Sequence, residues 1–200
     1  MNGYERRKHK KMEQIYTVAF QLFSRHGYQK VSVNEIAQQA GVSPATIYNY
    51  FGTKDQLYMD MIMDWTDKQL AVYERILDSG HTFAEKTQEI MLLEAKNLTF
   101  LSEEFRNFQT SEERGISQTI QQYSEEKVKG FFMRFVALGK QEGYIHKDQT
   151  EEVTMLYFSM FMHELRRRWD SGNREYVNGS METLMELFFY GLAGQKHEGK

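Results

Sequence analysis

Residues 43 to 50, Ser-Pro-Ala-Thr-Ile-Tyr-Asn-Tyr, place side chains that can bond nucleic acid on one short helix. Thr46 and Asn49 carry groups that can meet base edges, and a tyrosine hydroxyl such as that of Tyr48 can bond a phosphate oxygen. Ile47 and Phe51, one turn apart, form the apolar side of this helix and leave its polar residues facing outward. The pattern predicts a helix that enters the major groove of DNA; the simpler interpretation is a helical corner with surface tyrosines.

The flanking residues supply the start and stop signals that such a helix needs. Ser32 and Glu35 form a capping box at the start of one short helix, and Gly41 stands where a left-handed residue ends it. Ser43 then caps the next helix, with Pro44 in its first turn. A third capping box, at Thr53 and Gln56, begins a longer helix. This spacing predicts a helix-turn-helix.

The run from Ile15 to Leu57 closely resembles the TetR family of bacterial transcriptional regulators. The matching motifs are Ala19-Phe20-Gln21-Leu22-Phe23, Gly27-Tyr28, Ala40-Gly41-Val42-Ser43, Thr46-Ile47-Tyr48-Asn49-Tyr50-Phe51 and Lys54-Asp55-Gln56-Leu57. They cover about the first third of the chain, and beyond about residue 65 only helix number and length agree. We expect DNA contacts from Ser32, Asn34, Ser43, Pro44, Ala45, Thr46, Tyr48, Asn49, Tyr50 and Lys54.

The charge is divided along the chain, although the net charge is only −3. Residues 1 to 54 carry eight Lys or Arg against three Glu, a net +5, whereas the remainder carries 17 basic and 25 acidic residues, a net −8. A basic head on an acidic body fits phosphate binding by one domain. We expect the five basic residues from Arg6 to Lys11 to precede the first helix. They either lie along DNA or form a solvated tail.

Helical periodicity continues from Met12 almost to the end, and no segment alternates like a strand. The long helix after Thr53 runs to Ser79-Gly80, and further helices are expected at 83–101, 103–109, 117–142, 150–170 and 180–193, with a break from Ser111 to Ser117. The fold class predicted is all-α with about nine helices. We expect a DNA-binding domain at 1–54 and a ligand-binding and dimerisation domain at 55–200.

After Lys54 the chain holds 20 aromatic residues and 10 methionines among 146, which suits a core and also an adaptable apolar pocket. The TetR resemblance implies that part of this content encloses a small-molecule inducer. By location only, the candidate lining residues are Phe100, Phe105, Phe108, Tyr123, Phe131, Phe135 and Phe158.

The last two expected helices carry more apolar surface than one chain readily covers. Residues 150–170 have two apolar faces, one with Val153, Leu156, Tyr157 and Met160, the other spaced like a coiled-coil seam. The last helix is apolar nearly all round. A dimeric four-helix bundle would bury both, through Met155, Met162, Leu165, Trp169, Leu184, Phe188 and Leu192; a monomer with the last helix in a groove is the alternative.

Other chemistries have weaker support. His163-Glu164 starts like a zinc motif, but Arg167 occupies the second histidine position, the six histidines lack ligand spacing, and there is no cysteine. The longest apolar stretch is far below the ~20 residues of a membrane span, and no signal peptide is evident. We expect a cytoplasmic, homodimeric repressor without metal or cofactor that binds a palindromic operator and is released by an inducer. A DNA-organising protein without an inducer is the second hypothesis, and an enzyme is a distant third.

Overall fold

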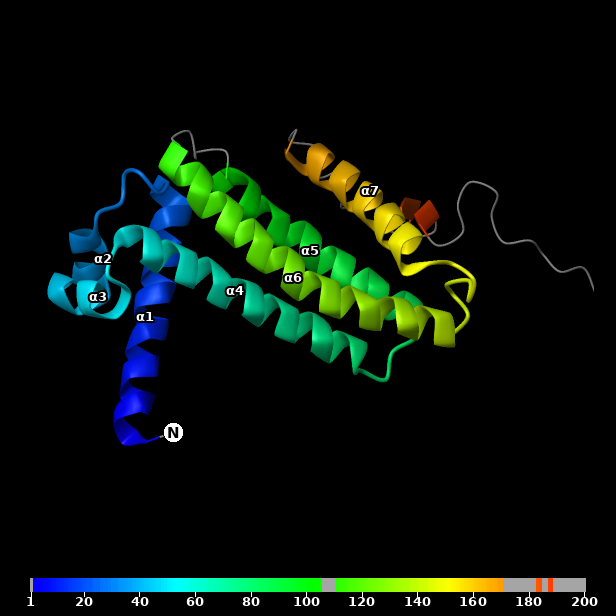
Figure 1. The fold of residues 1–200 in the computed structure, drawn as a ribbon, viewed down its shortest axis with the longest axis horizontal. Helices are drawn as coiled ribbons and strands as arrows, with labels where there is room; N and C mark the ends of the chain where they lie inside the picture. The colour runs from blue at the N-terminus through cyan, green and yellow to red at the C-terminus, as the bar shows by residue number, and fades with distance from the viewer. Residues whose placement is uncertain (1, 106–110, 171–182, 185–186, 189–200) are drawn as a thin grey trace, which may run out of the picture. The chain divides into compact units, whose positions relative to one another are not determined.

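The computed structural model describes residues 2–105, 111–170, 183–184 and 187–188. These residues form helices and no strand, so the all-α prediction is confirmed (Figure 1). The helices are α1 (Gly3–His26), α2 (Val33–Gln39), α3 (Pro44–Phe51), α4 (Lys54–Leu77), α5 (Phe83–Phe105), α6 (Ser111–Gln141) and α7 (Glu151–Asp170).

Seven helices are present in the described part of the chain, rather than about nine. The segments expected at 83–101 and 103–109 are continuous as far as Phe105 in α5, and most of 180–193 lies outside the described residues. The expected break from Ser111 to Ser117 is wrong, because α6 begins at Ser111. Glu and Arg are good helix formers and a lone glycine costs only about 1 kcal/mol, while buried Ile116 and Ile120 anchor this end of α6.

The cluster of basic residues from Arg6 to Lys11 also differs from expectation, since it lies within α1 and not before it. Asn2 caps this helix: its side chain accepts hydrogen bonds from the backbone of Tyr4 and Glu5, and Glu5 Oε2 accepts one from the Asn2 backbone at 2.9 Å. This capping box starts the helix nine residues before Met12. The five basic side chains therefore extend from a helix.

The chain divides into two compact units, which we call unit 1 (Met1–Leu70 with Phe100–Lys127) and unit 2 (Ala71–Thr99 with Val128–Lys200). Unit 1 has one apolar core that joins α1 to α3 to the first turns of α4 and to α6. Its fully buried side chains include Ile15, Phe23, Ile36, Ile47, Leu57, Tyr58, Met61, Ile62 and Ile120. The packing around the predicted DNA-binding segment thus continues past Lys54.

Unit 2 is joined mainly by aromatic contacts between its helices. Tyr73 of α4 packs on Phe131 of α6, and Phe83 of α5 packs on Phe135 of α6, with ring centroids 5.7 and 4.7 Å apart. Phe132 of α6 in turn packs on Phe158 of α7 at 5.2 Å. These contacts place the start of α5, the end of α6 and α7 around a common space.

Candidate functional site

The first candidate site is the helix-turn-helix of unit 1, which its sequence signals build as predicted. The Ser32 hydroxyl accepts the Glu35 backbone N–H at 3.2 Å, and Glu35 Oε2 accepts the Ser32 backbone N–H at 2.7 Å. The Ser32 backbone N–H, followed by the Ser32 hydroxyl, which also donates to Glu35 Oε2 at 2.8 Å, holds the pKa of Glu35 below its usual value. The capping box therefore fixes the start of α2, where Ser32 and the exposed Asn34 lie.

The turn between α2 and α3 is held from two sides. Gly41 has φ +62°, the left-handed conformation that other residues adopt only with strain. The Val42 N–H bonds the Ala37 carbonyl at 3.0 Å, and Gln14 of α1 donates from Nε2 to the Ala40 carbonyl at 3.0 Å. Gln14 thus ties the turn to α1, a role that the sequence analysis did not identify.

One side of helix α3 is buried in unit 1 and the other side is exposed to solvent. Ile47 and Phe51 are buried, whereas Tyr48 is 51% exposed and Asn49 is exposed. Pro44 and Ala45 are exposed as well, and Thr46 and Tyr50 are half-buried. The buried and exposed residues match the sequence prediction, except that Thr46 and Tyr50 are less exposed than expected.

Two of the α3 side chains have partners inside unit 1. The Thr46 hydroxyl lies 2.9 Å from that of Ser43, the residue that caps α3. The Tyr50 ring lies beneath the Lys8 ammonium, 5.6 Å from its centroid. This contact places the basic side chain of Lys8, from α1, next to α3, which the sequence could not show.

A second basic group is oriented at the start of α4. The Lys54 ammonium lies 4.2 Å from the centroid of the Tyr28 ring, and the Tyr28 hydroxyl donates a hydrogen bond to Asp55. Tyr28 is buried against Phe23 and Tyr58. A buried ring thus holds the Lys54 ammonium at the start of α4.

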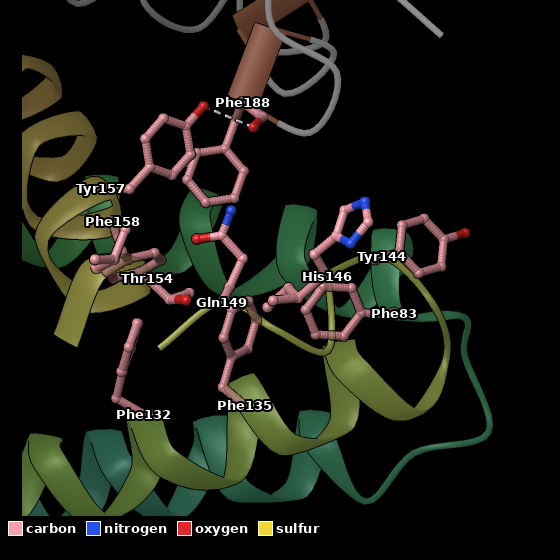
Figure 2. Close-up of a pocket in the computed structure, with 12 residues that line it drawn as sticks. Phe83, Phe132, Phe135, Tyr144, His146, Gln149, Thr154, Tyr157, Phe158 and Phe188 are labelled. Atoms are coloured by element: carbon pink, nitrogen blue, oxygen red, sulfur yellow. Dashed lines mark hydrogen bonds between the residues drawn. The ribbon is translucent and has the colours of Figure 1, made fainter. Parts of the chain in front are cut away.

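The second candidate site is a cavity of about 360 Å³ in unit 2. Its volume lies within the ~300–1,000 Å³ usual for small-molecule sites. Figure 2 shows its aromatic walls, formed by α5, α6, α7 and the loop between α6 and α7. The lining residues are Phe83, Phe132, Phe135, Tyr144, Ile145, His146, Gln149, Val153, Thr154, Tyr157, Phe158 and Phe188.

The loop between α6 and α7 is fixed against the start of α5. The carbonyl of Gly139 accepts the backbone N–H groups of Tyr144 and Ile145 at 2.9 and 3.0 Å. The Glu142 carboxylate accepts the first N–H of α5, at Phe83, at 2.9 Å. Lys140 Nζ donates to the Gln149 carbonyl at 2.6 Å. These bonds make the loop one wall of the cavity.

The sequence-predicted ligand residues are distributed over several places. Phe135 and Phe158 line the cavity, and Phe131 packs beside it on Tyr73. Tyr123 lies in unit 1, where its hydroxyl donates to Asp67 at 2.8 Å. Phe108 and the side chains of Phe100 and Phe105 lie outside the described residues. Phe83, Phe132 and the loop residues were not anticipated, because their partners are remote in sequence.

Only some of the predicted dimer residues are described. Met155 and Leu184 are half-buried, and Phe188 packs on Tyr157, Phe158 and Phe161. The side chains of Met162, Leu165 and Trp169, and the whole of Leu192, lie outside the described residues. The exposed apolar face of α7 is the other one, with Val153, Leu156, Tyr157 and Met160 exposed by 52, 60, 46 and 63%.

Among residues that the structure describes, no three His, Cys, Asp or Glu side chains gather as a metal site would require. None of the described helices combines the length and apolar character needed to span a bilayer.

Comparison with known proteins agrees with the geometry of unit 1. Residues 15–61 match the family model described as bacterial regulatory proteins, tetR family. The HTH-type transcriptional repressor KstR2 of Mycobacterium tuberculosis is 23% identical over 138 residues, which cover 68% of this chain and 69% of that protein. The KstR2 protein of Mycolicibacterium smegmatis is 27% identical over 74 residues, only 36% of its length. The resemblance to the TetR family is thus confirmed.

Solved structures share the fold over nearly their whole length. The fatty acid degradation regulator FadR of Bacillus halodurans superposes with a TM-score of 0.71 at 19% identity, covering 90% of this chain and 98% of that one. FadR of Bacillus subtilis, solved in complex with stearoyl-CoA, superposes with a TM-score of 0.64 at 20% identity, with the same coverages. At these identities the likeness concerns the fold.

Proposed function

We propose that this chain is a TetR-type transcriptional repressor that binds a palindromic operator as a dimer and leaves it when a small molecule occupies the cavity of unit 2. The observation that carries the proposal is α3, which buries Ile47 and Phe51 and leaves Tyr48 and Asn49 exposed on a rigidly capped helix-turn-helix. Such a helix fits the major groove, where side chains near its start meet base edges.

Each DNA contact follows from side-chain chemistry. Ala45, Thr46 and Asn49 face the bases, because a methyl group, a hydroxyl and an amide can each distinguish base pairs. Tyr48 and Lys54 bond phosphates and set the register without reading sequence. Ser32 and Asn34, at the start of α2, contact the sugar-phosphate backbone of DNA. Ser43, Pro44 and Tyr50, around α3, contact it as well.

The basic residues of α1 add affinity that does not depend on sequence. Arg6, Arg7, Lys8, Lys10 and Lys11 are exposed on one helix that packs against α2. Each phosphate that such residues neutralise releases counterions, so binding weakens as salt rises. Among them, Lys8 lies over the Tyr50 ring of α3.

Dimerisation supplies the second recognition helix. The exposed apolar face of α7, with Leu156 and Met160 at its centre, provides surface that a second copy would cover. The predicted residues Met155, Met162, Leu165, Trp169, Leu184, Phe188 and Leu192 extend the interface to the other face of α7 and the end of the chain. Two copies would then place their α3 helices about 34–36 Å apart, or a multiple of this, on a palindrome.

A ligand bound in the cavity would regulate operator binding. Its aromatic lining favours a ligand with a large apolar part, and the stearoyl-CoA bound to the B. subtilis FadR supports this ligand type. An inducer acts only through its different affinity for the DNA-bound and free conformations, typically ~1–3 kcal/mol of coupling. We assign DNA binding to residues 1–54 and ligand binding with dimerisation to 55–200, in a cytoplasmic regulator and not an enzyme.

Selection of bound fragments from sheared genomic DNA by the purified protein tests the proposal. We expect one or a few palindromic operators, and titration with increasing salt then measures the phosphate contacts. Lys54→Ala should weaken binding to every sequence and reduce the salt slope by about 1, whereas Lys54→Arg should retain the slope. Binding at many dispersed sites without a palindrome would favour the DNA-organising hypothesis, and no DNA binding would refute both.

A further inference from the structure

We infer that the cavity of unit 2 accepts only uncharged groups of a ligand, with an apolar body among the phenylalanine rings and one hydrogen-bonding group at Gln149 and His146. This inference rests on the proposed function, because it names the chemistry of the ligand that would act as inducer. It requires that any charge on the ligand remain outside the cavity.

The walls provide the first reason. Phe83, Phe132 and Phe135 are buried, and their rings form one continuous surface with Phe158 and Phe188. Ring centroids in this surface lie 4.7 to 6.1 Å apart, so the rings hold one another in place. A rigid apolar surface of this kind gains most from ligand surface that is itself apolar.

The absence of charge along the walls provides the second reason. Of the twelve lining residues in the described part of the chain, none is Lys, Arg, Asp or Glu. An ion that enters such a space loses part of its hydration and meets no charged side chain among these lining residues, which is more costly than burying a neutral polar group. The net −8 of residues 55–200 further disfavours anions.

The hydrogen-bonding groups provide the third reason. The Thr154 hydroxyl donates to the Thr150 carbonyl at 2.9 Å. The Tyr157 hydroxyl donates to the Phe188 carbonyl at 2.8 Å (Figure 2). Within the residues that the structure describes, the Gln149 amide and the His146 ring, both exposed at the edge of the cavity, make no hydrogen bond to protein groups, and Figure 2 shows the amide directed toward the Phe188 ring.

Gln149 and His146 therefore define the polar end of the site. A neutral amide offers a donor and an acceptor at one place, which suits a hydroxyl, a carbonyl or an N–H group. His146 and Gln149 come from the same loop, which Lys140 holds by its bond to the Gln149 carbonyl. The ligand's one polar group would meet this loop while its apolar body extends toward Phe132 and Phe158.

Two fluorescent probes that differ by one charge test the inference. N-phenyl-1-naphthylamine and 1-anilinonaphthalene-8-sulfonate share the same rings and the same N–H group, but only the second carries a sulfonate. We would titrate both into the full chain at pH 8. The uncharged probe should bind once per chain and about tenfold or more tightly than the sulfonate. Equal affinities within about threefold, or no binding of the uncharged probe, would overturn the inference.

Substitutions at Gln149 connect the preference to this cavity. Gln149→Lys should strengthen sulfonate binding by about fivefold or more, because it supplies the missing counterion. Gln149→Leu should weaken the uncharged probe by several-fold, through loss of its hydrogen bond. The control variants Gln141→Lys and Gln141→Leu, at the exposed end of α6, should bind both probes like the wild type. If Gln141→Lys and Gln149→Lys gained equally, the sulfonate would be responding to net charge and the site would be wrong.

Operator binding is measured separately with and without the uncharged probe. A probe that binds the cavity and leaves operator affinity unchanged would refute the inducer role and leave the ligand class standing. Loss of charge discrimination in a protein that still binds and releases its operator would refute the ligand class alone.

Discussion

Gly139 allows the loop between α6 and α7 to pack against α5, and Gly139→Ala tests this packing. A Cβ at this position would lie 2.6 Å from Ile145 Cδ1 and 2.7 Å from Phe83 Cζ. The Phe83 ring is fully buried, between Phe135 at 4.7 Å and Tyr144 at 5.4 Å, so it has little freedom to move away. Overpacking of this kind costs about 1–3 kcal/mol.

Gly130→Ala in the same helix is the matched control, because its Cβ would meet nothing within 4 Å. Alanine is favoured over glycine in a helix by about 0.8–1.0 kcal/mol, and this gain applies to both variants. The difference between the two variants isolates the packing term of about 1–3 kcal/mol, which corresponds to roughly 2–12 °C in Tm for a chain of this size.

Thermal unfolding followed by circular dichroism measures that difference. We expect Gly139→Ala to unfold at the lower temperature and to bind N-phenyl-1-naphthylamine more weakly, because Phe83 and Ile145 both line the cavity. If Gly139→Ala were as stable as Gly130→Ala, the close packing of the loop on α5 would be refuted.

Three further predictions concern assembly, pH and the helix-turn-helix. Leu156→Glu should convert the proposed dimer to a folded monomer in sedimentation measurements and weaken operator binding, because it places a charge on the exposed apolar face of α7. The control Gln141→Glu, at the exposed end of α6, should remain dimeric. A dimeric Leu156→Glu variant would show that the interface lies elsewhere. The hydrogen bonds from Ser32 hold the pKa of Glu35 below its ordinary value of 4.5. The ionised carboxylate therefore stabilises the fold above pH 4.5, and this stabilisation is lost as the pH falls through the lowered pKa. Urea unfolding from pH 7 to 3 should therefore show the wild type losing stability relative to Glu35→Gln, and a constant difference would contradict this. Gln14→Leu should lower the free energy of unfolding by about 0.5–1.5 kcal/mol, because the hydrogen bond to the Ala40 carbonyl is lost, and it should weaken operator binding. The control Gln21→Leu, at an exposed position of the same helix, should change neither the stability nor operator binding.

The helix-turn-helix could be predicted from the sequence because its signals are local. The Ser32–Glu35 and Ser43–Thr46 pairs act over three residues, and Gly41 marks its turn by its own backbone freedom. The burial of Ile47 and Phe51 follows from helical spacing alone. The same local reasoning failed at Ser111 to Ser117, where a glycine among helix formers was given too much weight.

The basic cluster of α1 shows how a short signal can be overlooked. Asn2 and Glu5 have the residue types of a cap, but the prediction started the helix at the first apolar stripe. Charged residues in the first turns of a helix carry no apolar periodicity, so the stripe marks where packing begins and not where the helix begins.

The cavity could be predicted only in part. Phe135 and Phe158 were chosen for their type and position, whereas Phe83 and Gln149 reach the same space through contacts across many residues of sequence. A glycine is required at position 139 because Phe83, 56 positions earlier in the sequence, packs too closely for a Cβ atom. The sequence alone does not reveal this contact. An aromatic-rich sequence specifies that rings will be buried, and does not specify which of them leave a space between them.

The sequence by itself determined the helical class, the capped helix-turn-helix and its outward residues, because capping and periodicity depend on neighbours within one or two turns. Only the tertiary structure decided that Lys54 lies over Tyr28, that Gln14 holds the α2–α3 turn, and which face of α7 stays exposed. Each of these depends on contacts between segments distant in the chain. Such contacts are set by how the helices pack together, which local patterns do not encode.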